Sequence, residues 1–67
     1  MHEDLGPRLK EHRDRLNLSQ RELADWLGVS VRAIQTWESG QAIPIPQHRR
    51  MLARFLATET IELEERA

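Results

Sequence analysis

The sequence predicts an all-α fold, and three observations lead to that prediction. Apolar residues recur at helical spacing in several short segments, and no run of alternating β-branched residues marks a strand. Serine residues stand where two helices would begin, and a glycine stands where one would end. The 67 residues contain no cysteine, which excludes disulfides and thiolate metal sites. We expect one small domain over residues 1–67, with its core in 5–57 and an acidic tail or short fifth helix in 58–67.

The first predicted helix covers about residues 5–16. An aspartate and a proline suit its first turn, and its buried stripe consists of Leu5, Leu9, His12 and Leu16. We interpret His12 as a half-buried packing residue, because the other two histidines are far away in sequence and lack the spacing of a metal site. Asn17 can adopt the left-handed conformation that ends the helix.

The second predicted helix begins at about Gln20. Ser19 and Glu22 have the spacing of a capping box, in which each side chain accepts a hydrogen bond from the other residue's amide. Gly28 supplies the positive φ that ends this helix without a Cβ clash. Trp26 lies off the buried stripe; we expect it to pack within the molecule, against the tail, while a dimer contact or a partner contact are the alternatives.

A third helix follows after a very short turn. Ser30 can cap it, and Ile34 and Trp37 form its buried face. Ala24 is small because two helices joined so closely must cross near that residue. Two short helices held at a steep angle by one glycine are the arrangement with which proteins place a helix in a DNA groove.

The last part of the chain begins with a stiff linker over residues 43–46, which contains two prolines. A fourth helix is expected to start near Pro46 or Gln47, and its apolar stripe of Met51, Leu52, Phe55 and Leu56 closes the core. In the tail, a threonine could cap a short fifth helix that carries Ile61. The apolar side of that helix could join a two-fold dimer interface.

The net charge of −1 is unevenly distributed along the chain. Residues 1–57 hold nine basic and seven acidic side chains, which gives +2, whereas residues 58–67 hold one arginine and four glutamates, which gives −3. Contact with phosphates requires a local basic face, so a net charge of −1 does not exclude binding to nucleic acid. With no signal peptide and no long apolar run, we expect a cytosolic location and no membrane association.

The segment over residues 20–40 resembles the helix-turn-helix of the Cro/C1 (XRE) family of phage and bacterial transcription regulators. The residues that carry the resemblance are Gln20, Leu23, Ala24, Leu27, Gly28, Val29, Ile34 and the run Trp37-Glu38-Ser39-Gly40. Residues 5–57 fit the pattern of that family's domain. The resemblance implies a compact five-helix, lambda-repressor-like DNA-binding domain whose helix-turn-helix consists of the second and third helices.

The resemblance also implies which side chains contact DNA. The expected base contacts come from Val31, Arg32, Gln35 and Thr36, which helix periodicity leaves facing outward. Arg32 suits guanine, Gln35 suits adenine and Val31 suits a thymine methyl group. The expected phosphate contacts come from Gln20, Ser30, Ser39, Gln41 and Arg49. The plainer interpretation is that these are solvent-facing positions on a surface helix.

In the resembling family, an arginine on the first helix bonds the glutamate that ends the recognition helix. Arg13 and Glu38 occupy these positions, so we expect a partly buried ion pair that fixes the angle between the two helices.

The function that follows is sequence-specific binding of double-stranded DNA by a transcription regulator, a repressor by hypothesis, acting as a homodimer on an inverted-repeat operator. A phage switch, a restriction-modification controller and a toxin-antitoxin regulator all stay open. The alternative is a protein-interaction module of antitoxin type, which binds a toxin or another regulator through Trp26 and the tail. No catalytic constellation occurs in the sequence, so we expect no enzyme activity, no cofactor and no metal.

Overall fold

The computed structural model of the chain describes residues 5–58, which form four helices. These are α1 (Leu5–Arg15), α2 (Gln20–Leu27), α3 (Val31–Ser39) and α4 (Pro46–Leu56). No strand occurs in this part of the chain, so the all-α prediction holds for it. The predicted fifth helix lies outside the described residues. None of these four helices is long and apolar enough to cross a membrane.

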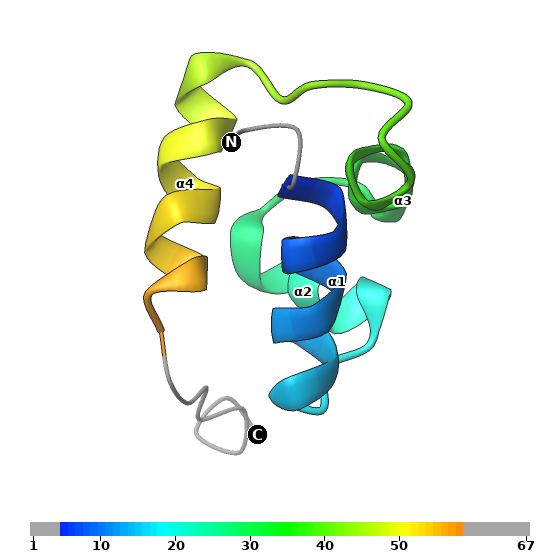
Figure 1. Cartoon of the computed structure of the whole chain (residues 1–67), viewed down its shortest axis with the longest axis vertical. Coiled ribbons are helices and arrows are strands. Elements are labelled where there is room, and N and C mark those ends of the chain that lie inside the picture. Colours follow the sequence, from blue (N-terminus) through cyan, green and yellow to red (C-terminus); the bar gives the residue numbers. More distant parts are fainter. Residues whose placement is uncertain (1–4, 59–67) are drawn as a thin grey trace.

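Helix α1 occupies the middle of the molecule. It packs against α3 on one side and α4 on the other, and α3 also packs against α2. Figure 1 looks nearly along the axis of α3, whereas α1 and α4 extend along the plane of the view, so α3 crosses the direction of both. Helix α3 therefore packs against both α1 and the short α2.

Local capping sets the ends of α2. The Ser19 hydroxyl accepts from the Glu22 amide at 3.0 Å, and the Glu22 carboxylate accepts from the Ser19 amide at 2.8 Å. Gly28 has a φ of 76°, and the amide of Val29 donates to the Ala24 carbonyl at 2.9 Å. The predicted capping box and glycine stop are both confirmed, because each depends only on neighbouring residues.

Helix α3 has the same construction. The Ser30 hydroxyl accepts from the Ala33 amide at 3.1 Å, as the sequence predicted. At the other end, Gly40 has a φ of 81° and the amide of Gln41 donates to the Thr36 carbonyl at 3.0 Å. Both ends of the helix are therefore satisfied by local hydrogen bonds.

Helix α1 ends one residue earlier than predicted. Asn17 adopts the expected left-handed conformation with a φ of 64°, and the amide of Leu18 donates to the Arg13 carbonyl at 3.0 Å. This turn sends Leu18 into the core, where it is buried. Arg15 is the last helical residue because the turn closes immediately after it.

The core consists of nine buried apolar residues that come from all four helices and from the turn after α1. They are Leu9, Leu18, Leu23, Ala24, Leu27, Ile34, Trp37, Leu52 and Phe55. The predicted core role of Trp37 is confirmed. Some residues of the predicted stripes, Leu5, Leu16, Met51 and Leu56, are only partly buried at the edge of this core.

Aromatic contacts join α1 and α2 to the end of α4. His12 is buried, its ring meets Phe55 edge-on with centroids 5.0 Å apart, and its Nε2 lies 2.6 Å from the Thr58 carbonyl, to which it donates. The Trp26 ring lies 5.7 Å from Phe55 and stays 38% exposed. Both residues therefore pack within the molecule, and His12 is more buried than the half-buried position that was expected. Of the tail, the structure describes Thr58, which lines a hollow together with Trp26; the rest of the expected contact falls outside the described residues.

Gly6 lies at a close approach between α1 and α3 that no pattern in the sequence predicted. A Cβ atom built on Gly6 would lie 2.7 Å from the Glu38 carbonyl oxygen and 2.9 Å from that of Trp37. These are backbone atoms at the end of α3, which cannot move aside as a flexible side chain could. Glycine is therefore what allows α1 to contact the end of α3.

Candidate nucleic-acid interface

Helix α3 has one buried face and one face that turns away from the rest of the molecule. Ile34 and Trp37 lie in the core, whereas Arg32 and Gln35 are exposed. In Figure 1, α3 lies at the side of the molecule opposite α4. The exposed side chains therefore project from a helix that is anchored by its other face.

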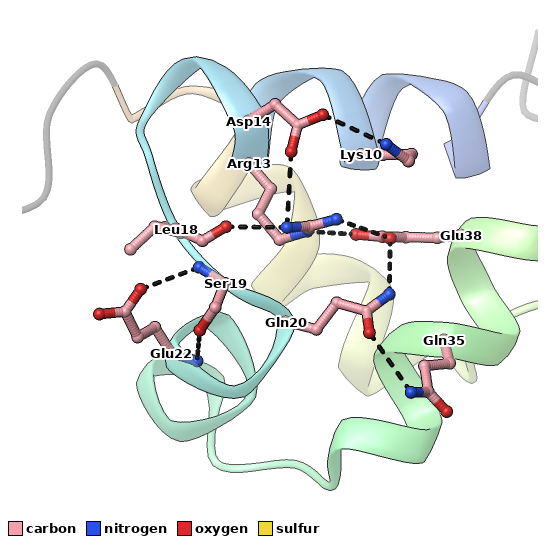
Figure 2. Close-up of polar contacts among 9 residues, drawn as sticks. All are labelled: Lys10, Arg13, Asp14, Leu18, Ser19, Gln20, Glu22, Gln35 and Glu38. Atoms are coloured by element: carbon pink, nitrogen blue, oxygen red, sulfur yellow. Dashed lines mark hydrogen bonds and ion pairs between the residues drawn. The ribbon is translucent and has the colours of Figure 1, made fainter.

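A buried ion pair holds the end of α3 against α1 (Figure 2). Arg13 donates from Nε to Oε2 of Glu38 at 2.7 Å and from Nη2 to Oε1 at 3.2 Å. Its Nη1 donates to the Leu18 carbonyl at 2.8 Å. The side chains of Arg13 and Glu38 are only 10% and 6% exposed. Such a fork-shaped pair fixes both distance and orientation.

The charge of Arg13 is secured by these contacts. The hydrogen bond to Glu38 raises the pKa of the Arg13 guanidinium above its ordinary value, and burial opposes this rise. The nearby carboxylate of Asp14, 3.5 Å from Nη1, also favours the charged form. The guanidinium is thus protonated throughout the accessible pH range.

Gln20 connects this ion pair to the exposed face of α3 (Figure 2). Its Nε2 donates to Oε1 of Glu38 at 3.1 Å, and its Oε1 accepts from Nε2 of Gln35 at 3.3 Å. A residue expected to contact phosphate and a residue expected to contact a base are therefore in direct contact. No local pattern in the sequence indicates this link, because it depends on how α2 and α3 cross.

Two of the four expected base-contacting residues are less exposed than expected. Val31 and Thr36 are half-buried: Val31 packs against the core, and the Thr36 hydroxyl donates to the Ala33 carbonyl at 2.9 Å. Both therefore lie at the boundary between the buried and the exposed face of α3, rather than on the exposed face itself. Only three residues separate α2 from α3, so the first turn of α3 remains close to the core.

The residues expected to contact phosphate lie beside α3 and at both of its ends. Gln20, at the start of α2, lies beside Gln35 and Glu38, and Ser30 directly precedes α3. The hydroxyl of Ser39, in the last turn of α3, donates to the Thr36 carbonyl at 3.2 Å. Gln41 is exposed just beyond it. Arg49 is exposed on α4, and it lines a hollow together with Trp37, Gly40 and Ala42, so it lies near the loop after α3.

Arg32 and Arg49 differ from two basic residues of α1 in their pairing. On α1, Lys10 lies 3.3 Å from Asp14 and Arg15 lies 4.0 Å from Glu11. Within residues 5–58, neither Arg32 nor Arg49 forms an ion pair. The positive charge that Arg32 places on the exposed face of α3 is therefore not neutralised by an acidic side chain of this part of the chain.

Residues 4–66 match the family described as a helix-turn-helix domain. The chain belongs to this family. Its helix-turn-helix consists of α2, the turn at Gly28 and α3, which confirms the resemblance found in the sequence. The type II methyltransferase M1.ScrFI of Lactococcus lactis subsp. cremoris is 42% identical over 50 residues, which make up 70% of this chain and 13% of that protein. No solved structure gives a significant match.

The chemistry of this helix-turn-helix is that of a binding surface. The exposed face of α3 offers a guanidinium and an amide, and hydroxyls and amides flank it. Among residues 5–58, no group of three or more histidine or acidic side chains could hold a metal ion. The arrangement supplies hydrogen-bond donors and acceptors on an exposed helix.

Proposed function

We propose that this protein is a sequence-specific DNA-binding transcription regulator that inserts α3 into the major groove. The observation that carries the proposal is the contact between Gln20, Glu38 and Gln35, which holds an exposed amide of α3 in place from the buried ion pair. A solvent-facing residue on an ordinary surface helix has no need of such support. Preorganised polar groups on a rigid element are typical of a recognition surface.

The exposed side chains of α3 match the chemistry of base edges. Arg32 can donate two hydrogen bonds to O6 and N7 of guanine. Gln35 uses one hydrogen of Nε2 for Gln20, and keeps the other hydrogen and Oε1 for N7 and the N6 amino group of adenine. Val31 and Thr36, although half-buried, have methyl groups suited to the methyl group of thymine.

Phosphate contacts would lie on both sides of these base contacts. Ser30 stands at the start of α3, Gln20 lies beside Gln35, and Ser39, Gln41 and Arg49 come from the last turn of α3 and from the chain after it. Ser30 accepts from the Ala33 amide but keeps its own hydroxyl hydrogen for a phosphate oxygen. Contacts on two sides fix the register of the helix along the groove.

The regulator acts by occupying its site as a homodimer. One α3 per protomer would enter two half-sites about one helical turn apart, which gives an inverted-repeat operator. Repression follows if the operator overlaps a promoter, because the bound protein excludes polymerase.

A protein-binding role of antitoxin type is the second candidate. Trp26 is 38% exposed and lines a hollow together with Met51, Arg54 and Thr58. Exposed tryptophan beside apolar and cationic side chains is typical of protein interfaces. This surface lies away from the exposed face of α3, so the two functions can be separated by mutation.

The test is selection of bound sequences from a randomised duplex library, performed with the wild-type protein and with Arg32→Ala. We expect an enriched inverted repeat, and a loss of about 1–3 kcal/mol of specific binding in the variant together with relaxed preference at one base pair. Arg54→Ala, which removes an exposed arginine beside Trp26, is the matched control and should retain the same site. Failure of the wild-type protein to enrich any sequence would leave the protein-binding role as the better account.

A further inference from the structure

We propose that Glu38, which is buried and contacts no base, determines which base Gln35 selects. Glu38 fixes whether the nitrogen or the oxygen of the Gln20 amide faces it, and Gln20 in turn fixes the same for the Gln35 amide. The inference rests on the proposed DNA-binding function and makes Glu38 a positioning residue for base specificity.

The first step is that Glu38 can only accept hydrogen bonds. Its carboxylate is paired with the Arg13 guanidinium through both oxygens, at 2.7 Å and 3.2 Å. An ionised carboxylate has no hydrogen to donate. Any side chain that bonds to Glu38 must therefore turn a donor toward it.

The second step concerns Gln20. Because its partner Glu38 only accepts, Gln20 must place Nε2 toward Glu38, at 3.1 Å, and this places Oε1 on the side that faces Gln35. The donor and acceptor atoms of an amide group are otherwise nearly equivalent in shape, so the hydrogen-bonding partner decides its direction.

The third step concerns Gln35. Since Gln20 offers an oxygen, Gln35 must donate to it from Nε2, at 3.3 Å. One hydrogen of Nε2 and the whole of Oε1 are left for DNA. A donor beside an acceptor matches the N7 and N6 edge of adenine and does not match guanine, whose O6 and N7 both accept.

Replacing Glu38 by glutamine should reverse the orientation of both amides, that of Gln20 and that of Gln35. The shorter contact, from Nε of Arg13 at 2.7 Å, requires an oxygen at the Oε2 position, so the new amide nitrogen takes the Oε1 position that faces Gln20, and the longer contact from Nη2 of Arg13, at 3.2 Å, is lost. Gln20 then turns its oxygen toward position 38 and its nitrogen toward Gln35. Gln35 accepts from that nitrogen, and both hydrogens of its own Nε2 become available for O6 and N7 of guanine.

The experiment is the same library selection with Glu38→Gln. Gln35→Ala first identifies the base pair that Gln35 contacts, as the position whose preference is lost. At that position we expect adenine in the wild-type selection, and in Glu38→Gln a shift of the adenine-to-guanine ratio by at least about tenfold toward guanine, with the other positions unchanged. Thermal unfolding followed by circular dichroism shows whether each variant is folded at the selection temperature.

Asp14→Asn is the matched control, because it makes the same carboxylate-to-amide change beside the same guanidinium. Asp14 lies 3.5 Å from Nη1 of Arg13 but does not contact Gln20, so the adenine preference should persist. Gln20→Ala provides an independent test in a protein that keeps its buried ion pair. Without Gln20 the Gln35 amide can turn freely, and the position should accept both purines.

The outcomes separate the inference from the proposed function. A wild-type protein that selects no sequence overturns both. If the wild-type protein selects a clear operator and the folded Glu38→Gln variant still selects only adenine at the Gln35 position, the role of Glu38 is overturned and the proposed function stands. Should Glu38→Gln not fold, an unchanged adenine preference in Gln20→Ala overturns the inference, and acceptance of both purines supports it.

Discussion

Single residues on α1 determine how closely the end of α3 can approach it. Gly6 brings its backbone against the Trp37 and Glu38 carbonyls, and Arg13, about two turns further along α1, bonds the Glu38 side chain. The first contact is steric and the second is electrostatic, yet they act on the same few residues of α3. Together they fix the position of the helix that carries Arg32 and Gln35.

Substituting Gly6 by alanine should therefore destabilise the domain. The new methyl group would lie 2.7 Å from the Glu38 carbonyl oxygen, so α1 and α3 must separate. We expect a loss of about 1–3 kcal/mol in the free energy of unfolding, the usual effect of inserting a methyl group into a closely packed contact. Urea denaturation measures it, with Lys10→Ala, at an exposed position of the same helix, as the control. Equal stability of Gly6→Ala and wild type would show that α3 can shift without cost.

Some of these residue contacts could be predicted from the sequence and others could not. The Arg13–Glu38 pair was expected because both residues occupy positions of a resembling family, and the left-handed Asn17 was expected because it depends on its own backbone. The proximity of Gly6 to α3 and the bonds of Gln20 to Glu38 and Gln35 were not expected. They arise from the crossing of helices that are distant in sequence, which no periodicity or capping pattern specifies.

At the scale of elements, the helix boundaries follow from local chemistry. Both α2 and α3 begin after a serine that caps them and end at a glycine with positive φ. Each signal involves residues within one turn of the boundary, so the sequence sufficed to locate both helices. Val31 is less exposed than expected, because burial depends on the neighbouring elements as well as on the helix itself.

The two capping serines should differ in their effect on DNA binding. Ser19→Ala and Ser30→Ala each remove a side-chain acceptor from an amide at a helix start, and each should cost about 1 kcal/mol of stability. Only Ser30 is proposed to contact phosphate, so only Ser30→Ala should weaken binding when affinities are compared under conditions where both variants are folded. Fluorescence anisotropy with a labelled operator measures this difference. Equal affinities of the two variants would show that Ser30 does not contact the DNA.

At the scale of the whole molecule, the distribution of charge matters more than its sum. The net charge of −1 contains an excess of positive charge in residues 1–57 and of negative charge in 58–67. Most of the proposed phosphate contacts come from neutral groups, the amides of Gln20 and Gln41 and the hydroxyls of Ser30 and Ser39. Such an interface orients the protein on DNA but releases few counterions, so its non-specific affinity should be low and its salt dependence shallow.

Arg49 is the charged member of the proposed phosphate contacts, so its removal should be visible in the salt dependence. Each phosphate neutralised by a cation contributes about 0.9 to the slope of log K against log salt concentration, so Arg49→Gln should reduce the slope by about that amount per protomer. Affinity should fall by a similar factor for operator and for unrelated DNA, because a phosphate contact carries no sequence information. Titrations over a series of salt concentrations measure both effects. Arg54→Gln removes the same charge from the same helix beside Trp26 and controls for the change in net charge. If both variants lower the slope equally, the effect is one of overall charge and Arg49 does not contact the phosphate backbone.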